Sequence, residues 1–321
     1  AQAARDLIET LYRGGGRDVV ISPGSRNTPL VLAAEAIAGL RKTVVVDERC
    51  AGFIALGLSR CSARPALLIC TSGSAAAHYL PALLEAHTAR VPLIVLSAAR
   101  PEELDQCGAQ QSLVQSTLFS DYTRLARQAP LADERGAPAW RSLAVAALAA
   151  CWGSPEGPVH LNLPFREPLW QAGLETKPCE GHDFLPCLPA PDQQALPSVA
   201  QRLAGKRGVI VCGAMHGCVP SDEGLAAAVG ALAQALGWPV LCEPASRLRG
   251  RLATNEIAYA DRLHAAGFFT QQRVEAVVQL GSAPTSKGLR AWLGEPKEAS
   301  LLIDRDGWWR DPGHTAHLLV A

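Results

Sequence analysis

Short runs of valine, isoleucine and leucine alternate along the first half of the chain with longer segments rich in alanine and leucine. The runs carry no polar alternation, which is typical of strands buried on both faces of a parallel sheet. A strand–helix alternation of this kind predicts α/β units with right-handed crossovers. The expected strands are 19–22, 43–46, 66–70, 93–97 and 159–163, and the expected helices are 3–13, 29–39, 51–62, 75–87 and 139–151.

The alternation stops in a proline-rich stretch and then starts again. Seven prolines lie from Pro164 to Pro197 with no clear period. We therefore expect a linker over 171–200 between a first domain, 1–170, and a smaller α/β domain, 201–321. The length of 321 residues agrees with two domains, at about 150 residues each. The second domain is expected to contain strands 208–212, 240–241, 276–280 and 299–303 and helices 221–236, 258–266 and 286–293.

The charge balance excludes one class of partner. Thirty basic and thirty acidic residues give no net charge, whereas nucleic-acid-binding domains usually carry a basic excess. We therefore expect no nucleic-acid partner, although a few arginines can still hold a small anionic substrate. No long apolar run predicts a membrane span, and no secretory signal is recognisable. The expected location is the cytoplasm, with a plastid left open because the chain starts at Ala1 and not at methionine.

The cysteines and histidines do not predict a metal site. The chain has 10 cysteines but no Cys-x-x-Cys pair, and its 8 histidines are scattered. Cys61, Cys70, Cys151 and Cys242 lie in apolar segments, where we expect reduced, buried thiols. We therefore assign a metal-ligand role to no residue of the chain.

Polar residues follow each of the first four expected strands. The loops are Ser22-Pro23-Gly24-Ser25-Arg26-Asn27-Thr28-Pro29, Asp47-Glu48-Arg49, Thr71-Ser72-Gly73-Ser74, and Arg100-Pro101 with Cys107-Gly108-Ala109-Gln110-Gln111. In an open parallel sheet, ligands bind beyond the carboxyl ends of the strands. Because four strands bring polar groups to this edge, the sequence predicts a ligand site there.

The residue types in these loops suit a small anionic ligand. Gly24 allows a close approach of the backbone, Ser25 offers a hydroxyl, and Arg26 offers a planar fork for a carboxylate or phosphate. Two structural alternatives stay open. The first loop can be an ordinary turn with Thr28 as the helix cap, and the acid at Glu48 can simply compensate a helix dipole instead of acting as a general acid or base.

In order and spacing, these motifs resemble the N-terminal part of the MenD family, the 2-succinyl-5-enolpyruvyl-6-hydroxy-3-cyclohexene-1-carboxylate synthases. The resemblance is strong to about residue 170 and continues more weakly through Gly237-Trp238-Pro239 and the segment 281–287. The family depends on thiamine diphosphate and belongs to menaquinone biosynthesis. The resemblance implies a parallel-sheet domain that binds the cofactor's pyrimidine over 1–170, followed by a smaller Rossmann-like central domain over 201–321.

The resemblance also implies roles for individual residues. Glu48 matches the family's cofactor-activating glutamate, which hydrogen-bonds a pyrimidine ring nitrogen and promotes the imino tautomer of the cofactor. The other residues expected at thiamine diphosphate are Pro23, Gly24, Thr71, Gly73 and Ser74.

The family's reaction explains why basic residues are expected at the site. The enzyme, a transferase, decarboxylates 2-oxoglutarate and adds the resulting succinyl-semialdehyde carbanion to isochorismate, and both substrates carry two carboxylates. The residues matched to substrate binding are Ser25, Arg26, Arg100, Gln111 and Lys287. For Lys287 the structural alternative is a solvated helix residue.

One part of the family pattern has no counterpart here. A third family domain holds Mg²⁺ on the diphosphate through a Gly-Asp dipeptide and a later asparagine, and this chain contains no Gly-Asp. We therefore expect the diphosphate and metal domain to be absent and the chain alone to be inactive. The complete protein is expected to be a homodimer or tetramer, because cofactor sites in this family form between subunits. Two other functions stay open: a non-catalytic homologue that binds a ligand or partner, and another thiamine-diphosphate 2-oxo acid decarboxylase or synthase.

Overall fold

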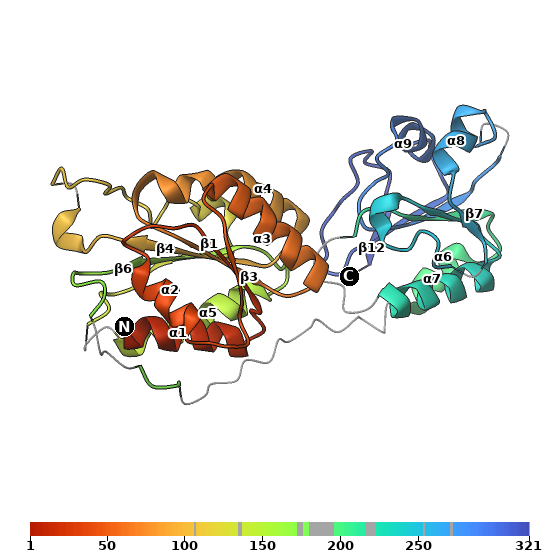
Figure 1. Ribbon diagram of the computed structural model, residues 1–321. Helices are drawn as coiled ribbons and strands as arrows, with labels where there is room; N and C mark the ends of the chain where they lie inside the picture. Colours follow the sequence, from red (N-terminus) through yellow and green to blue (C-terminus); the bar gives the residue numbers. More distant parts are fainter. Residues whose placement is uncertain are drawn as a thin grey trace. The chain divides into compact units, whose positions relative to one another are not determined.

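Two parallel sheets organise the computed structural model of the chain, one in each of two compact units, Ala1–Leu188 and Pro189–Ala321 (Figure 1). The structure describes residues 1–105, 107–133, 137–171, 176–179, 196–215, 222–252, 254–269 and 272–320. The expected linker 171–200 therefore lies largely outside the described residues. Within the described residues both units are α/β, as the sequence predicts.

The sheet of the first unit has six parallel strands in the order β2-β1-β3-β4-β6-β5. The strands are β1 (Asp18–Ile21), β2 (Arg41–Val44), β3 (Ala66–Cys70), β4 (Leu93–Ala99), β5 (Leu125–Gln128) and β6 (Val159–Pro164). The helices are α1 (Gln2–Arg13), α2 (Thr28–Glu35), α3 (Glu48–Ser62), α4 (Leu80–Ala89) and α5 (Ala137–Cys151). Figure 1 shows α1, α2 and α5 on one face of this sheet and α3 and α4 on the other.

The apolar strand residues fill a core on each face of the sheet. Val19 and Ile21 belong to the cluster that contains α1, α2 and α5, whereas Val20 packs with residues of α3 and α4. Successive side chains of a strand point to opposite faces, so a strand covered on both faces is mostly apolar, and its few polar residues must be hydrogen-bonded. This requirement explains the continuous apolar runs in β1, β3 and β4.

Strand β2 is the exception to the expectation of fully buried strands. It lies at the edge of the sheet and begins at Arg41, two residues before the expected start. Its residues are exposed or half-buried, and Val44 is 66% exposed. The prediction of an apolar, doubly covered strand over 43–46 is therefore wrong, because β2 lies at the edge of the sheet and its side chains are not covered on both faces. The other edge strand, β5, was not predicted, because its sequence Leu-Ala-Arg-Gln has no apolar run.

The predicted helix bounds differ from the structure in several places, and the expected helix 29–39 already ends at Glu35. The expected helix 75–87 is a 3-10 segment, η1 (Gly73–Tyr79), followed by α4. In the second unit α6 (Leu196–Leu203) begins inside the range expected to be a linker. The linker was inferred from the density of prolines, but Pro197 lies in the first turn of α6, where a proline removes no helical hydrogen bond. Buried thiols are found at Cys70, Cys151 and Cys242, whereas Cys61 is exposed.

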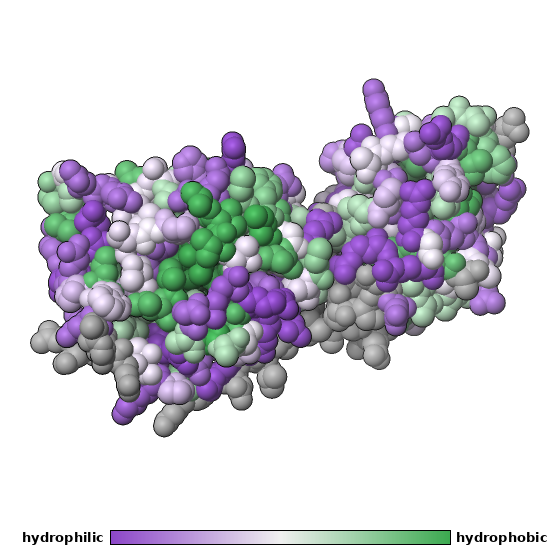
Figure 2. All heavy atoms as spheres, viewed as in Figure 1, coloured by the Kyte–Doolittle hydropathy of each residue, from purple (hydrophilic) through white to green (hydrophobic). Residues whose placement is uncertain are grey.

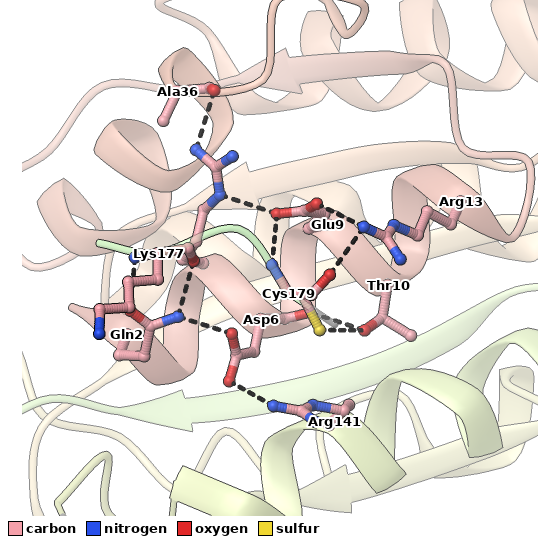
Figure 3. Close-up of polar contacts among 10 residues, drawn as sticks. Gln2, Asp6, Glu9, Thr10, Arg13, Ala36, Arg141, Lys177 and Cys179 are labelled. Atoms are coloured by element: carbon pink, nitrogen blue, oxygen red, sulfur yellow. Dashed lines mark hydrogen bonds and ion pairs between the residues drawn. The ribbon is translucent and has the colours of Figure 1, made fainter. Parts of the chain in front are cut away.

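A polar cluster on α1 binds the backbone of Cys179, which is far from this helix in the sequence (Figure 3). The Glu9 carboxylate pairs with Arg5 and Arg13 at 3.0 Å each and accepts a hydrogen bond from the backbone N–H of Cys179 at 3.1 Å. Arg13 also donates to the carbonyl oxygen of Cys179 at 2.7 Å. Burial acts to raise the pKa of Glu9, but these hydrogen bonds and the arginine charges hold it below its ordinary value.

The second unit has six parallel strands in the order β12-β11-β10-β7-β8-β9. The strands are β7 (Gly208–Cys212), β8 (Val240–Cys242), β9 (Glu256–Ile257), β10 (Ala276–Leu280), β11 (Ala299–Ile303) and β12 (Leu318–Val320). Its helices besides α6 are α7 (Asp222–Leu236), α8 (Ala260–Ala265) and α9 (Lys287–Leu293). Buried residues of α6 and α7 pack on one face and those of α8 and α9 on the other. The short β9 and β12 were not predicted.

Among the residues that the structure describes, no helix is long and apolar enough to cross a membrane.

A buried histidine links the stability of the first unit to pH. His160 in β6 is fully buried, its Nε2 lies 2.6 Å from the Ser97 hydroxyl oxygen, and burial lowers its pKa to about 3. The unfolded chain takes up this proton near pH 6.5, so it binds more protons than the folded chain between pH 6.5 and 3. The free energy of unfolding therefore falls as the pH falls through this range, by up to about 1.4 kcal/mol per pH unit.

We predict that His160→Gln flattens this pH dependence, because glutamine can keep a hydrogen bond to Ser97 without taking up a proton. Urea titrations at pH 7, 6 and 5 measure the slope for the transition of the first unit. The matched control is His78→Gln, since His78 is exposed and should leave the slope unchanged. Equal slopes in the wild type and His160→Gln would contradict the prediction.

Candidate functional site

The candidate site lies at the carboxyl edge of the first sheet, where the strand order changes direction. Strand β1 lies between β2 and β3, so the chain leaves β1 toward one side and continues from β3 toward the other. This is the position at which open α/β sheets bind ligands. The loops after β1 and β3 touch there: a Cβ on Gly24 would lie 2.3 Å from the Cβ of Thr71. Only glycine at position 24 allows this approach.

Hydrogen bonds to the backbone shape the loop after β1. Asn27, the residue before α2, is fully buried and donates from Nδ2 to the carbonyl oxygen of Ser22 at 2.8 Å. Thr28 is the first residue of α2 and donates to the carbonyl oxygen of Ser25 at 2.7 Å. The alternative in which Thr28 caps the helix is therefore wrong. Pro23, Gly24 and Ser25 are exposed, so their polar groups are accessible to a ligand.

Arg26 is buried and already bound to a carboxylate. Its Nη1 donates to the carbonyl oxygen of Phe165 at 3.1 Å, and its Nη2 lies 3.1 Å from Oε1 of Glu167. The Arg26 side chain is 8% exposed, whereas that of Glu167 is 71% exposed. The carboxylate that Arg26 holds therefore belongs to an exposed side chain, which a ligand carboxylate could replace.

Glu48 and its neighbour Asp47 have different surroundings at the start of α3. Asp47 is the helix cap, and its carboxylate accepts a hydrogen bond from the backbone N–H of Cys50 at 2.8 Å. Glu48 is half-buried and has no ion pair or side-chain hydrogen bond to the residues that the structure describes. Its charge reaches the end of β3, since burial and then the Glu48 carboxylate raise the pKa of the Cys70 thiol. Asp47 thus accounts for capping, which leaves the Glu48 carboxylate available.

The loop after β3 runs along the loop after β1. Thr71, Ser72 and Gly73 are buried and Ser74 is exposed. Gly73 has φ +89°, a left-handed conformation that favours glycine. The two strand ends are also joined by Tyr79, whose hydroxyl donates to the Ser22 hydroxyl oxygen at 3.0 Å.

Arg100 and Gln111 come from the segments that follow β4. Arg100 is half-buried, and its Nε is buried without a hydrogen-bond partner among the described residues. Such an unsatisfied donor is expected where a ligand completes the site. Gln111 is exposed, but its Nε2 donates to the carbonyl oxygen of Ser72 at 3.0 Å. The structure therefore brings Gln111 to the loop after β3, although about forty residues separate them.

The remaining predicted residue, Lys287, lies in the second unit. It is the exposed first residue of α9, and the preceding Ser286 caps this helix. Lys287 lines a cavity of about 390 Å³ together with Arg290, Asp311 and Thr315.

A set of buried amides behind the loops was not predicted from the sequence. Gln115 accepts a hydrogen bond from the N–H of Gly73 at 2.7 Å, and it donates to Asn162 of β6 at 3.1 Å. The available signal was a polar residue, Asn162, within the apolar strand 159–163.

The cavity of about 490 Å³ between α2 and the segments after β5 and β6 contains none of the predicted site residues.

Metal ligands are not grouped in the described part of the chain. No cluster of three or more histidine, cysteine, aspartate or glutamate side chains there could hold a metal ion.

Two family profiles match the chain. Residues 1–118 match the "Thiamine pyrophosphate enzyme, N-terminal TPP binding domain" and residues 186–319 match the "Middle domain of thiamine pyrophosphate". A structure solved for a candidate thiamin diphosphate-dependent enzyme from Mycobacterium smegmatis is similar over 100% of this chain and 60% of that chain. Its TM-score is 0.70 at 17% identity, which supports the fold.

Curated relatives identify a narrower family. The 2-succinyl-5-enolpyruvyl-6-hydroxy-3-cyclohexene-1-carboxylate synthase of Myxococcus xanthus is 40% identical over 99% of this chain and 56% of its own length. The synthases of Bacillus velezensis and Thermosynechococcus vestitus are 39% and 41% identical over 98% and 96% of this chain. The chain thus spans little more than half the length of these relatives. It belongs to the 2-succinyl-5-enolpyruvyl-6-hydroxy-3-cyclohexene-1-carboxylate synthase (MenD) family of thiamine pyrophosphate enzymes.

Proposed function

We propose that this chain supplies the pyrimidine side of a thiamine diphosphate site and part of a dicarboxylate site. The proposed reaction, which the resemblance to the family implies, decarboxylates 2-oxoglutarate and transfers the four-carbon unit to isochorismate. The names of the relatives give a succinylated cyclohexene carboxylate as the compound that they synthesise. The observation that carries this proposal is the half-buried Glu48 carboxylate, unpaired among the described residues, next to the touching loops after β1 and β3.

The residues present fit the pyrimidine half of the cofactor. A carboxyl group with no protein partner can share a proton with a ring nitrogen, and Glu48 is such a group in a partly enclosed position. Gly24 and Gly73 bring backbone close to the same place, and the exposed hydroxyl of Ser74 adds a donor. Thiamine diphosphate supplies, when bound, the electron sink for decarboxylation of a 2-oxo acid. The chain's own task is to hold the proton at Glu48 Oε and to orient the ring.

The substrate carboxylates are proposed to bind arginine and amide groups around this centre. Arg26 already holds one carboxylate, that of Glu167, which is the geometry a substrate carboxylate would adopt. Arg100 has an unsatisfied Nε, and Gln111 and Ser25 offer further hydrogen bonds. Lys287 is proposed to add a positive charge for isochorismate.

The diphosphate and Mg²⁺ are proposed to bind outside the residues that the structure describes. Those residues contain no cluster of metal-ligating side chains, and the chain covers 56% of the length of the Myxococcus xanthus synthase. The remainder of that length is where we place the diphosphate and metal ligands.

An exposed apolar surface on the first unit supports the proposal of a homo-oligomer. Figure 2 shows hydrophobic residues gathered on one face of this unit. The exposed apolar side chains of β2, the following loop and α3 include Val44 (66%), Val46 (82%), Phe53 (44%) and Ile54 (40%). Contiguous apolar surface of this kind marks an interaction site, and a second copy of the chain is the proposed partner.

The first test removes the proton-holding group. In the complete product of the gene that encodes this chain, Glu48→Gln should lower kcat for condensation of 2-oxoglutarate with isochorismate by about 10²-fold or more, because general acid–base catalysis contributes about that much. The control Glu35→Gln removes an exposed carboxylate on α2 and should leave kcat unchanged. A kcat for Glu48→Gln within twofold of the wild type would rule out the role. No product from these substrates in the wild-type protein would favour a different 2-oxo acid enzyme or a binding protein.

The second test concerns the carboxylate that already occupies Arg26. Glu167→Gln should lower KM for the substrate whose carboxylate Arg26 binds by up to about fivefold, since an exposed ion pair is worth about 0.2–1 kcal/mol, and kcat should not change. The exposed Glu102, changed to glutamine, is the matched control. A rise in KM would contradict competition and would make Glu167 a residue that orients Arg26.

A further inference from the structure

A single peptide group in the loop after β3 is held at both of its ends. The carbonyl oxygen of Ser72 accepts a hydrogen bond from Nε2 of Gln111 at 3.0 Å. The N–H of Gly73, which belongs to the same peptide bond, donates to Oε1 of Gln115 at 2.7 Å. Gln111 and Gln115 therefore form hydrogen bonds to opposite ends of the Ser72–Gly73 peptide group.

The Gln115 side chain is held by hydrogen bonds to strands β4 and β6 in the sheet. Gln115 is 2% exposed, and its Nε2 donates to the carbonyl oxygen of Ala98 and to Oδ1 of Asn162, both at 3.1 Å. Asn162 is held in turn by the Ser97 hydroxyl, which donates to the same oxygen at 3.1 Å. All hydrogen-bonding groups of the Gln115 amide thus point at fixed atoms on β4, β6 and the loop.

This anchoring fixes a backbone that would otherwise rotate easily. Glycine occupies positive and negative φ almost equally, so the peptide before Gly73 can flip at little steric cost. In the observed orientation, the Ser72 carbonyl faces the Gln111 amide. A Cβ at Gly73 would lie 2.7 Å from Cγ of Gln111, so the Gln111 side chain lies directly over this glycine. A flipped peptide would present its N–H to Gln111 and remove the acceptor that holds it.

We propose that Gln115 is a positioning residue: it locks the orientation of the Ser72–Gly73 peptide and thereby holds Gln111 over the loops of the candidate site. Its effect on catalysis rests on the proposed function, but its effect on the peptide does not. Gln115 itself is buried behind the loop and acts through Gly73 and Gln111.

Amide hydrogen exchange of the Gly73 N–H, measured by NMR on the 321-residue chain, tests the lock directly. Gln115→Met, which keeps the side-chain length but has no amide, should accelerate this exchange at least tenfold. Gln115→Glu keeps the acceptor for the Gly73 N–H but loses the donors to Ala98 and Asn162, so it should retain part of the protection. Gln111→Met removes only the hydrogen bond to the Ser72 carbonyl oxygen, so the Gly73 exchange rate should stay within twofold of the wild type. The same is expected for Gln110→Met, a control at an exposed neighbouring residue. The amides of Leu68 and Ile69 in β3 should stay within twofold in every variant.

Several results would overturn the proposal. Unchanged Gly73 exchange in Gln115→Met would show that the hydrogen bond does not fix the peptide, and an equal rise at Leu68 and Ile69 would show a purely structural role. In the condensation assay, Gln115→Met should lower kcat/KM about tenfold with partial rescue by Gln115→Glu, and an unchanged value would also overturn it. A wild-type protein without condensation activity would refute the proposed function and leave the exchange result to decide on the lock.

Discussion

Parallel pairing of β1 with both β2 and β3 is the constraint on which the candidate site depends. It brings the carboxyl ends of three strands to one edge, so Glu48, the Gly24 loop and the Thr71–Ser74 loop become neighbours. The loops can then touch only because residue 24 has no side chain. Placement of the polar groups is thus a consequence of strand order, and their fine orientation is a consequence of glycine.

Much of this arrangement could be predicted from the residues, for a physical reason. Strands covered on both faces are mostly apolar, so β3, β7, β10 and β11 have the bounds that their apolar runs predict. Edge strands need not be apolar on both faces, so β5 and β9 lack apolar runs and were missed, and the short edge strand β12 was missed too. The apolar residues at the end of β2 wrongly indicated a buried strand for the same reason, because an edge strand can carry them exposed. The polar loops were found because they follow apolar runs, but their roles came from the resemblance to a family and not from spacing.

What spacing could not reveal is the pairing of side chains across the sheet. The ion pair of Arg26 with Glu167 joins residues 141 positions apart, and the hydrogen bond of Gly73 with Gln115 joins residues 42 apart. Both connections change the expected picture of the site. Arg26 is a fork that already holds a carboxylate, and the loop after β3 is fixed by a buried amide and not only by its glycine.

The central claim is that the loops after β1 and β3, with Glu48, form the pyrimidine side of a thiamine diphosphate site. Hydrogen exchange of the complete gene product, with and without thiamine diphosphate and Mg²⁺, tests it most directly. The account predicts cofactor-dependent protection in segments 22–27, 48–52 and 71–74, and loss of the protection at 48–52 in Glu48→Gln. Binding of the cofactor without protection in any of these segments would contradict it.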